Sequence, residues 1–275
     1  MPPHSRRTGS ANDPGPQEAG PARVRRRRTA LLAAAVLTSL GVLGVIAAGV
    51  GSPASSGTSP KAGFVLHAGP PSSVPPGATP ASFPKSGPGT WRYSGGRGSV
   101  LGGAGPVERY QVAVESNIAV DPGRFAAKVD RTLGDPRSWI AGRQFRLQRV
   151  PVGSPSDFTI YLATERTSAQ MCAAGGNETD GYTSCQTSGH VIINLDRWNL
   201  SVPDYVHAHV PLDAYRTYVI NHETGHQFGN GHELCPAAGR PAPVMEQQTL
   251  GLHGCTANPW PYLHGQRYAG PSGQY

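Results

Sequence analysis

Charge is scarce in most of this 275-residue chain, and its scarcity limits the partners that the chain can have. The formal net charge is +7, but residues 1–28 carry seven arginines against two acidic residues, which gives +5 there and leaves +2 for the rest. No basic stripe with interleaved aromatic residues follows, so the sequence does not support nucleic-acid binding. The arginines of this basic tail are Arg6, Arg7, Arg23, Arg25, Arg26, Arg27 and Arg28.

Apolar residues are sparse between positions 51 and 90, where 32 of 40 residues are Gly, Pro, Ser, Ala or Thr. Such a segment buries too little apolar surface to offset the entropy lost on folding. We therefore expect residues 51–90 to be a disordered linker that is partly polyproline-like. No internal repeat occurs, so a solenoid is not indicated.

Residues 29–50 lack charge altogether, but here the segment is strongly apolar. Ala30 to Val50 would span about 31 Å as a helix, close to the thickness of a bilayer core. A transmembrane signal anchor and a cleaved signal peptide both fit. The length of the run and the lack of an A-x-A site favour the anchor, with the basic tail in the cytoplasm. In either case the remaining chain is expected outside the cytoplasm, held at the cell membrane or secreted.

The folded domain is expected to occupy residues 91–275, which suffices for one hydrophobic core. Period-two and helical patterns alternate along it, with Asp121 and Pro122 as the start signals of the first helix. These elements predict an α+β domain with a mixed sheet. The expected strands are 108–115, 143–150, 157–163 and 190–196, and the expected helices are 121–134 and 210–229.

The four cysteines all fall in this domain, and the linker has none. An even number outside the cytoplasm predicts two disulfides, for which three pairings exist. We favour the local pairing, Cys172 with Cys185 and Cys235 with Cys255. No CxxC occurs, so a cysteine-rich zinc site has little support.

The stretch "NHETGHQFGNGH", residues 221–232, continues an apolar helical stripe into two histidines. His222 and His226 lie one turn apart, so they can offer two nitrogens to one zinc ion while Glu223 projects beside them. A left-handed Gly229 would end the helix and let the chain return His232 as a third ligand. The stripe is formed by Leu212, Tyr215, Val219, His222 and His226.

This HExxHxxGxxH pattern resembles the signature of the metzincin clan of zinc metallopeptidases. Met245 in "GRPAPVMEQQT" resembles the clan's Met-turn. With "HVIINLDRW", "NPWP" and the N-terminal segments, the chain resembles a poorly characterised actinobacterial family of secreted or membrane-anchored metzincin-like proteins. The resemblance spans about residues 91–260 and implies a metzincin-like fold: a mixed twisted sheet, an active-site helix and a C-terminal subdomain with the Met-turn.

The resemblance implies an extracytoplasmic zinc endopeptidase that acts on protein or peptide substrates. Zn²⁺ would be held by His222, His226 and His232, and Glu223 would serve as general base. Two alternatives stay open: an inactive zinc-containing binding module at the cell surface, and a zinc hydrolase acting on cell-wall amides. The segment 190–196 fits two interpretations equally well: a sheet-edge strand that aligns substrate, or a core strand.

Some residues depart from the clan pattern or have two interpretations. Several clan members carry a Tyr where this chain has Gln247; Tyr262 or Tyr268 could substitute for it. Glu233 resembles the astacin arrangement, although a solvated charge explains it equally. The sequence does not indicate an oligomeric state. His207 and His209 could bind a second metal, but surface histidines are the simpler interpretation.

Overall fold

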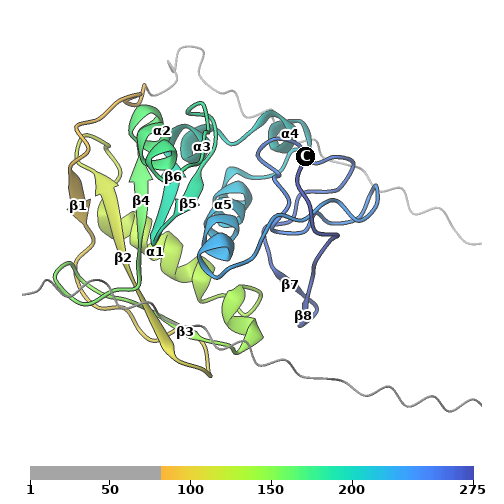
Figure 1. Cartoon of the computed structure of the whole chain (residues 1–275), viewed down its shortest axis with the longest axis horizontal. Helices are drawn as coiled ribbons and strands as arrows, with labels where there is room; N and C mark the ends of the chain where they lie inside the picture. Colours follow the sequence, from red (N-terminus) through yellow and green to blue (C-terminus); the bar gives the residue numbers. More distant parts are fainter. Residues whose placement is uncertain (1–81) are drawn as a thin grey trace, which may run out of the picture. The chain divides into compact units, whose positions relative to one another are not determined.

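The computed structural model describes residues 82–275 (Figure 1). The basic tail, the apolar segment 29–50 and residues 51–81 of the linker lie outside the described residues. Within 82–275, no helix is both long and apolar enough to cross a bilayer. The residues just before Trp91 pack on the domain: Phe83 contacts the core, and Lys85 forms ion pairs with Glu165, at 3.2 Å, and with Asp196.

A six-stranded mixed sheet forms the centre of the fold, with strand order β1-β2-β4-β6-β5 and with β3 also paired to β2 (Figure 1). Strands β2, β4 and β6 are parallel to one another, and β3 is parallel to the first half of β2. The edge strands β1 and β5 are antiparallel to their neighbours. The predicted α+β class with a mixed sheet is confirmed. The strands are β1 (Trp91–Tyr93), β2 (Val107–Glu115), β3 (Arg146–Arg149), β4 (Phe158–Ala163), β5 (Cys185–Thr187) and β6 (His190–Asn194).

Helices cover both faces of this sheet. Val191 and Ile193 of β6 belong to the larger core, which α1 and α5 complete, whereas Ile192 joins a smaller core with Cys172 of α2. Because successive strand residues point to opposite faces, α2 lies across the sheet from α1 and α5. The helices are α1 (Pro122–Leu133), the 3₁₀ helix η1 (Trp139–Gly142), α2 (Glu165–Ala174), α3 (Leu195–Leu200), α4 (Pro203–His207) and α5 (Leu212–Gln227); a hairpin of β7 (Tyr262–Leu263) and β8 (Gln266–Arg267) follows.

Local capping explains where two elements begin and end. The carboxylate of Asp121 accepts a hydrogen bond from the Arg124 backbone N–H at 2.8 Å, which caps α1 as its sequence predicts. Strand β6 ends at Asn194, two residues before the predicted end. The Asn194 side chain accepts a hydrogen bond from the Asp196 backbone N–H at 2.9 Å, so it starts helix α3 where the alternation of apolar residues predicted more strand.

Both disulfides follow the predicted local pairing. Cys172 is bonded to Cys185, which ties α2 to the edge strand β5. Cys235 is bonded to Cys255, which ties the chain just after His232 to a loop twenty residues further on. Each bond closes a short loop and so limits the freedom of the unfolded chain.

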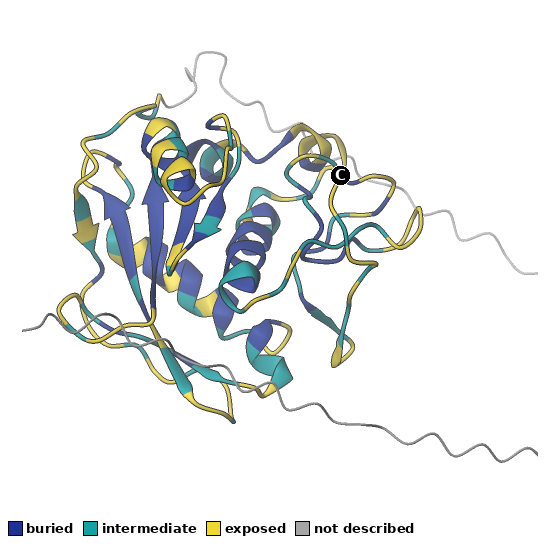
Figure 2. Ribbon diagram, in the orientation of Figure 1, coloured by how far each residue is buried: buried dark blue, intermediate teal, exposed yellow. Residues whose placement is uncertain are grey.

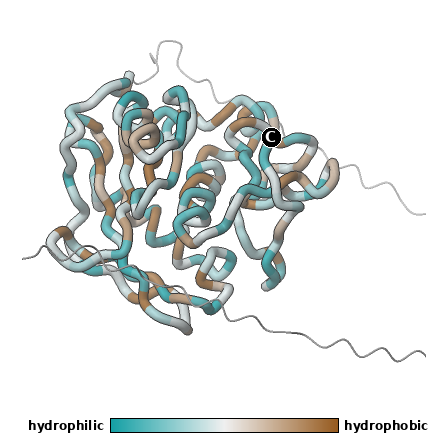
Figure 3. The backbone as a smooth tube through the Cα atoms, in the orientation of Figure 1, coloured by the Kyte–Doolittle hydropathy of each residue, from teal (hydrophilic) through white to brown (hydrophobic). Residues whose placement is uncertain are grey.

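Helix α5 is buried although much of it is hydrophilic (Figures 2 and 3). Every residue from Thr217 to Gly225 is buried, including Asn221, His222 and Glu223. A helix that only packed against a sheet would keep polar residues on an exposed face. Because polar groups are buried on α5, we expect this helix to carry a functional site.

Gly225 permits close packing beneath α5. A Cβ added at Gly225 would lie 2.4 Å from the Met245 Sδ and 2.6 Å from the Trp139 Cζ2. Both neighbours are buried, at 0% and 6% exposure, so neither can move aside into solvent. A side chain larger than hydrogen is therefore excluded between Glu223 and His226.

We predict that Gly225→Ala lowers the free energy of unfolding by about 1–3 kcal/mol, the usual cost of overpacking. Helix propensity alone would favour alanine by about 1 kcal/mol, so the clash has to exceed that gain. Chemical denaturation of the full chain measures the change. Gly231→Ala is the matched control, because nothing lies within 4 Å of its added Cβ. Equal stabilities of the two variants would contradict the packing argument.

Candidate metal centre

The end of α5 and the turn after it position three histidines. His222 and His226 lie in the last turns of the helix, which ends at Gln227. Gly229 adopts φ +83, the left-handed conformation that the sequence predicts for the residue that ends the helix. Asn230 then donates two hydrogen bonds to the Gly225 carbonyl oxygen, each 3.0 Å long, from its backbone N–H and from its side-chain amide. These bonds fold the chain back and bring His232 to the helical pair.

The three imidazole rings converge through the same nitrogen. His226 Nε2 lies 3.2 Å from His222 Nε2 and 3.1 Å from His232 Nε2. Two nitrogens that share a zinc ion at about 2.0–2.1 Å lie roughly 3.3 Å apart in a tetrahedral site. The spacing and the donor type therefore fit a zinc ion.

The opposite nitrogen of each ring contacts an oxygen acceptor. His222 Nδ1 lies 2.9 Å from the Val244 carbonyl oxygen, His226 Nδ1 lies 2.9 Å from that of Asn230, and His232 Nδ1 lies 3.1 Å from the Gln274 Oε1. Because backbone carbonyl oxygens can only accept, the Nδ1 atoms of His222 and His226 carry the proton, and their Nε2 atoms present lone pairs to the shared point. The Gln274 Oε1 offers an acceptor to His232 Nδ1 in the corresponding place.

Burial keeps two of the rings, those of His222 and His226, neutral. Burial is the largest cause of the lowered pKa of His222, and the neighbouring His226 lowers it further. The pKa of His226 falls to about 4, again chiefly through burial and then through His232. Two of the three rings are therefore neutral donors at physiological pH, the form that a metal requires.

Glu223 shares a cleft of about 590 Å³ with the three histidines. Its side chain is buried, and burial raises the pKa of its carboxyl to about 8. The cleft also exposes amide and hydroxyl groups from the loop before β5 and from the chain after Met245. These groups include Asn177, Thr179, Thr183, Ser184, Gln186, Gln247 and Thr249.

Met245 lies on a tight turn under the histidines. The Glu246 backbone N–H donates to the Pro243 carbonyl at 3.0 Å, which closes a four-residue turn with Val244 and Met245 at its centre. The preceding carbonyl, that of Val244, holds His222. The turn therefore orients a histidine through its backbone and packs against α5 through its methionine side chain.

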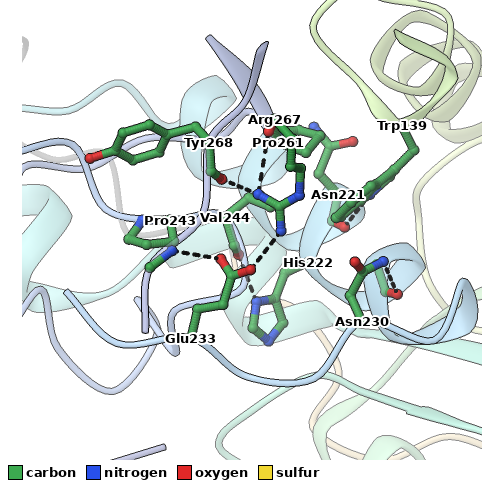
Figure 4. Close-up of polar contacts among 12 residues, drawn as sticks. Trp139, Asn221, His222, Asn230, Glu233, Pro243, Val244, Pro261, Arg267 and Tyr268 are labelled. Atoms are coloured by element: carbon green, nitrogen blue, oxygen red, sulfur yellow. Dashed lines mark hydrogen bonds and ion pairs between the residues drawn. The ribbon is translucent and has the colours of Figure 1, made fainter. Parts of the chain in front are cut away.

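Glu233, the residue that follows His232, forms an ion pair with Arg267 (Figure 4). Glu233 Oε1 accepts from the Arg267 guanidinium at 2.8 Å, and its other oxygen accepts from the Gly270 backbone N–H at 3.4 Å. The Arg267 guanidinium also lies over the ring of Trp139, 5.2 Å from its centroid. Glu233 is therefore a paired structural residue and not a solvated charge.

Asn221, the residue before His222, connects helix α5 to two segments that lie far away in the sequence. It is fully buried, and its side chain accepts from the Ser138 hydroxyl at 2.8 Å and donates to the Pro259 carbonyl at 2.8 Å. Its backbone carbonyl accepts from the Trp139 indole N–H at 2.8 Å (Figure 4). Sequence reasoning missed Asn221, Arg267 and Gln274 because their partners lie far away in the sequence.

The structure decides between alternatives that the sequence leaves open. Strand 190–196 is not a sheet edge, because β6 lies between β4 and β5; the edge strand is β5, whose Gln186 lines the cleft. Tyr262 and Tyr268 do not line the cleft, and the Tyr268 hydroxyl donates to the Pro241 carbonyl at 2.9 Å. The aromatic residue that does line it is Tyr218.

The structure does not bring the other candidate metal ligands, His207 and His209, together with acidic or sulfur-containing side chains. His207 ends α4 and His209 follows it in a left-handed conformation; both are exposed, and neither joins a cluster of metal-ligating side chains among residues 82–275. A second cluster does exist, with Cys235, Cys255 and the carboxyl of Glu246. Its two cysteines form a disulfide, so they offer no thiolate to a metal.

A family of proteins described as "Protein of unknown function (DUF3152)" matches residues 74–263. The chain belongs to this family. No curated protein and no solved structure matches the chain. The part of this DUF3152 chain that matches includes α5 and Met245, and it ends before Arg267 and Gln274.

Glu246 is a buried acid in the DUF3152 domain with no compensating contact. The residue has 0% exposure, and neither carboxyl oxygen has a hydrogen-bond partner among the described residues. Burial raises the pKa of this carboxyl from about 4.5 to about 7. The folded state therefore holds a proton that the unfolded state has already released between these two values.

We predict that the free energy of unfolding of the metal-free wild type falls as pH rises from about 4.5 to about 7, by at most about 1.4 kcal/mol per pH unit from this residue. Glu246→Gln removes that dependence, so the variant gains stability relative to wild type as pH rises through this window. Urea denaturation at several pH values measures the difference. Glu178→Gln, at an exposed position, is the control; an unchanged slope in Glu246→Gln would contradict the assignment.

Proposed function

We propose that this DUF3152 protein is a metzincin-like, zinc-dependent endopeptidase that hydrolyses protein or peptide substrates outside the cytoplasm. One observation carries the proposal: the Nε2 atoms of His222, His226 and His232 converge while every Nδ1 is committed to an oxygen acceptor. The Nε2 lone pair of His226 lies 3.2 Å from His222 Nε2 and 3.1 Å from His232 Nε2, and lone pairs this close repel one another unless a cation lies among them. Neutral imidazole in this number and spacing is a donor set typical of catalytic zinc.

His222, His226 and His232 would hold the zinc ion, which would supply Lewis acidity to make water a nucleophile near neutral pH and to polarise a scissile carbonyl. The rings are oriented for this role by the hydrogen-bond contacts of their Nδ1 atoms with Val244, Asn230 and Gln274. The carboxylate of Glu223 accepts the proton of the attacking water and passes it to the leaving amine.

Glu223 also favours hydrolysis over a passive binding role. A structural metal site needs no carboxyl beside it, and burial of this one raises its pKa to about 8 at a cost to stability. A nearby divalent cation favours the ionised form, which is the form that acts as a base. The cleft that Glu223 lines has a volume of about 590 Å³ and is also lined by residues of the edge strand β5.

Extracytoplasmic placement is supported by the two disulfides. Such bonds persist in oxidising compartments and are rare in the cytosol. The segment 29–50 provides the proposed membrane anchor or export signal, with the basic tail on the cytoplasmic side. The substrate is accordingly a peptide or protein reached at or beyond the membrane.

We predict that the purified full chain binds one zinc ion and cleaves members of a peptide library, and that chelation stops the cleavage. Glu223→Gln should keep the zinc and lose at least about 100-fold in kcat, because the general base is gone. His226→Ala should lose the zinc itself. Metal analysis and mass spectrometry of the cleaved peptides measure these effects, with Glu108→Gln on the remote strand β2 as control.

The outcomes separate the alternatives. A zinc-loaded wild type that cleaves no peptide but releases fragments from purified cell wall would identify a cell-wall amidase. A zinc-loaded wild type that cleaves neither, with a Glu223→Gln variant indistinguishable from it, would identify a binding module. A folded wild type without zinc would overturn the proposed function.

A further inference from the structure

A segment far from the histidine motif in sequence lies alongside its third histidine. Residues Pro271–Tyr275 run antiparallel to the chain that carries His232, with Ser272 bridged to Glu233. The Gly273 backbone N–H donates to the His232 carbonyl at 3.1 Å, and the Leu234 N–H donates to the Pro271 carbonyl at 2.8 Å. We call residues Pro271–Tyr275 the strap. It pairs with the backbone of His232 and Leu234, on both sides of Glu233.

The strap places one side chain against the His232 ring. Gln274 Oε1 lies 3.1 Å from His232 Nδ1, and Gln274 lines the cleft with the three histidines. The other two rings bond to backbone carbonyls that their local turns hold in place. Only His232 depends on a side chain, and that side chain comes from 42 residues away.

We infer that Gln274 is a positioning residue of the metal site: it fixes the tautomer and the direction of the His232 ring. The inference rests on the proposed zinc site and deepens it. His222 and His226 are aligned by the helix that carries them, whereas His232 lies on irregular chain after Gly229. A ring there can rotate, and its proton can sit on either nitrogen. An acceptor on Nδ1 keeps the lone pair on Nε2.

The strap is held at both ends of Gln274, so the amide itself is well placed. The Tyr275 hydroxyl accepts from the Cys235 N–H at 3.0 Å, and its ring stacks on His253 with 3.4 Å between centroids. On the other side, Glu233 binds Arg267 and the Gly270 N–H (Figure 4). Gly270 permits this approach, because an added Cβ would lie 2.1 Å from the Leu234 carbonyl oxygen.

The test compares zinc affinity in full-chain variants. Gln274→Leu keeps the approximate size of the side chain and removes the acceptor, whereas Gln274→Glu keeps an acceptor in the same place. We expect Gln274→Leu to weaken zinc binding about 10-fold or more, the usual effect of losing such a partner, and Gln274→Glu to bind at least as tightly as wild type. Competition with a chelator of known affinity gives the dissociation constants.

A second measurement reports on the ring directly. In the metal-free full chain, ¹⁵N NMR should show the proton of His232 on Nδ1 in wild type and in Gln274→Glu. In Gln274→Leu the proton should spread to Nε2, because Nδ1 has lost its acceptor. If the strap had a purely structural role, Gln274→Leu would change stability but not the tautomer ratio of His232, and Gln274→Glu would bring no rescue.

Two controls share the surroundings but not the contact. Gln266→Leu makes the same change at an exposed position of β8, and Ser272→Ala alters the strap without touching the ring; neither should change zinc affinity. Zinc affinity in Gln274→Leu equal to that of these controls would overturn the inference while the zinc site stands. If wild type binds no zinc, the proposed function fails, and the tautomer measurement still decides whether Gln274 orients His232.

Discussion

The burial of polar side chains on α5 is the constraint on which the rest of the structure depends. A buried polar group costs free energy unless it finds a partner, so each such residue forces other parts of the chain into place. Asn221 fixes the segments of Ser138 and Pro259, and His222 fixes the turn that contains Met245. The helix therefore organises the irregular C-terminal part of the domain, which has little regular hydrogen bonding of its own.

The three histidines differ in how firmly the fold directs them. The spacing of His222 and His226 follows from the helix, and both rings bond to backbone carbonyls. His232 needs a left-handed glycine, the two hydrogen bonds of Asn230 and the strap to reach the same point. In the proposed metal site, the placement of His232 therefore depends on more of the fold than that of His222 or His226.

The sequence predicts the features that depend on local spacing. Helical periodicity correctly brings His222 and His226 to one face, and Gly229 has the left-handed conformation that a return of His232 requires. The sequence alone cannot predict the hydrogen-bond and pairing partners that tertiary folding supplies. The β6 strand lies inside the sheet because the short strand β5 pairs beyond it, and nothing in the alternation of residues 190–196 reveals that. Arg267 and Gln274 have no spacing signal, since they reach the site through turns.

Charge balance in the cleft connects these features to chemistry. No Lys or Arg lines the cleft among the described residues, and its histidines are held neutral at His222 and His226 by burial. Burial raises the pKa of the Glu223 carboxyl, and no Lys or Arg of the cleft offsets this effect. Three lone pairs and a buried acid with no basic neighbour form an arrangement that lacks positive charge from the protein. This arrangement is the reason why we propose a divalent cation at the Nε2 atoms.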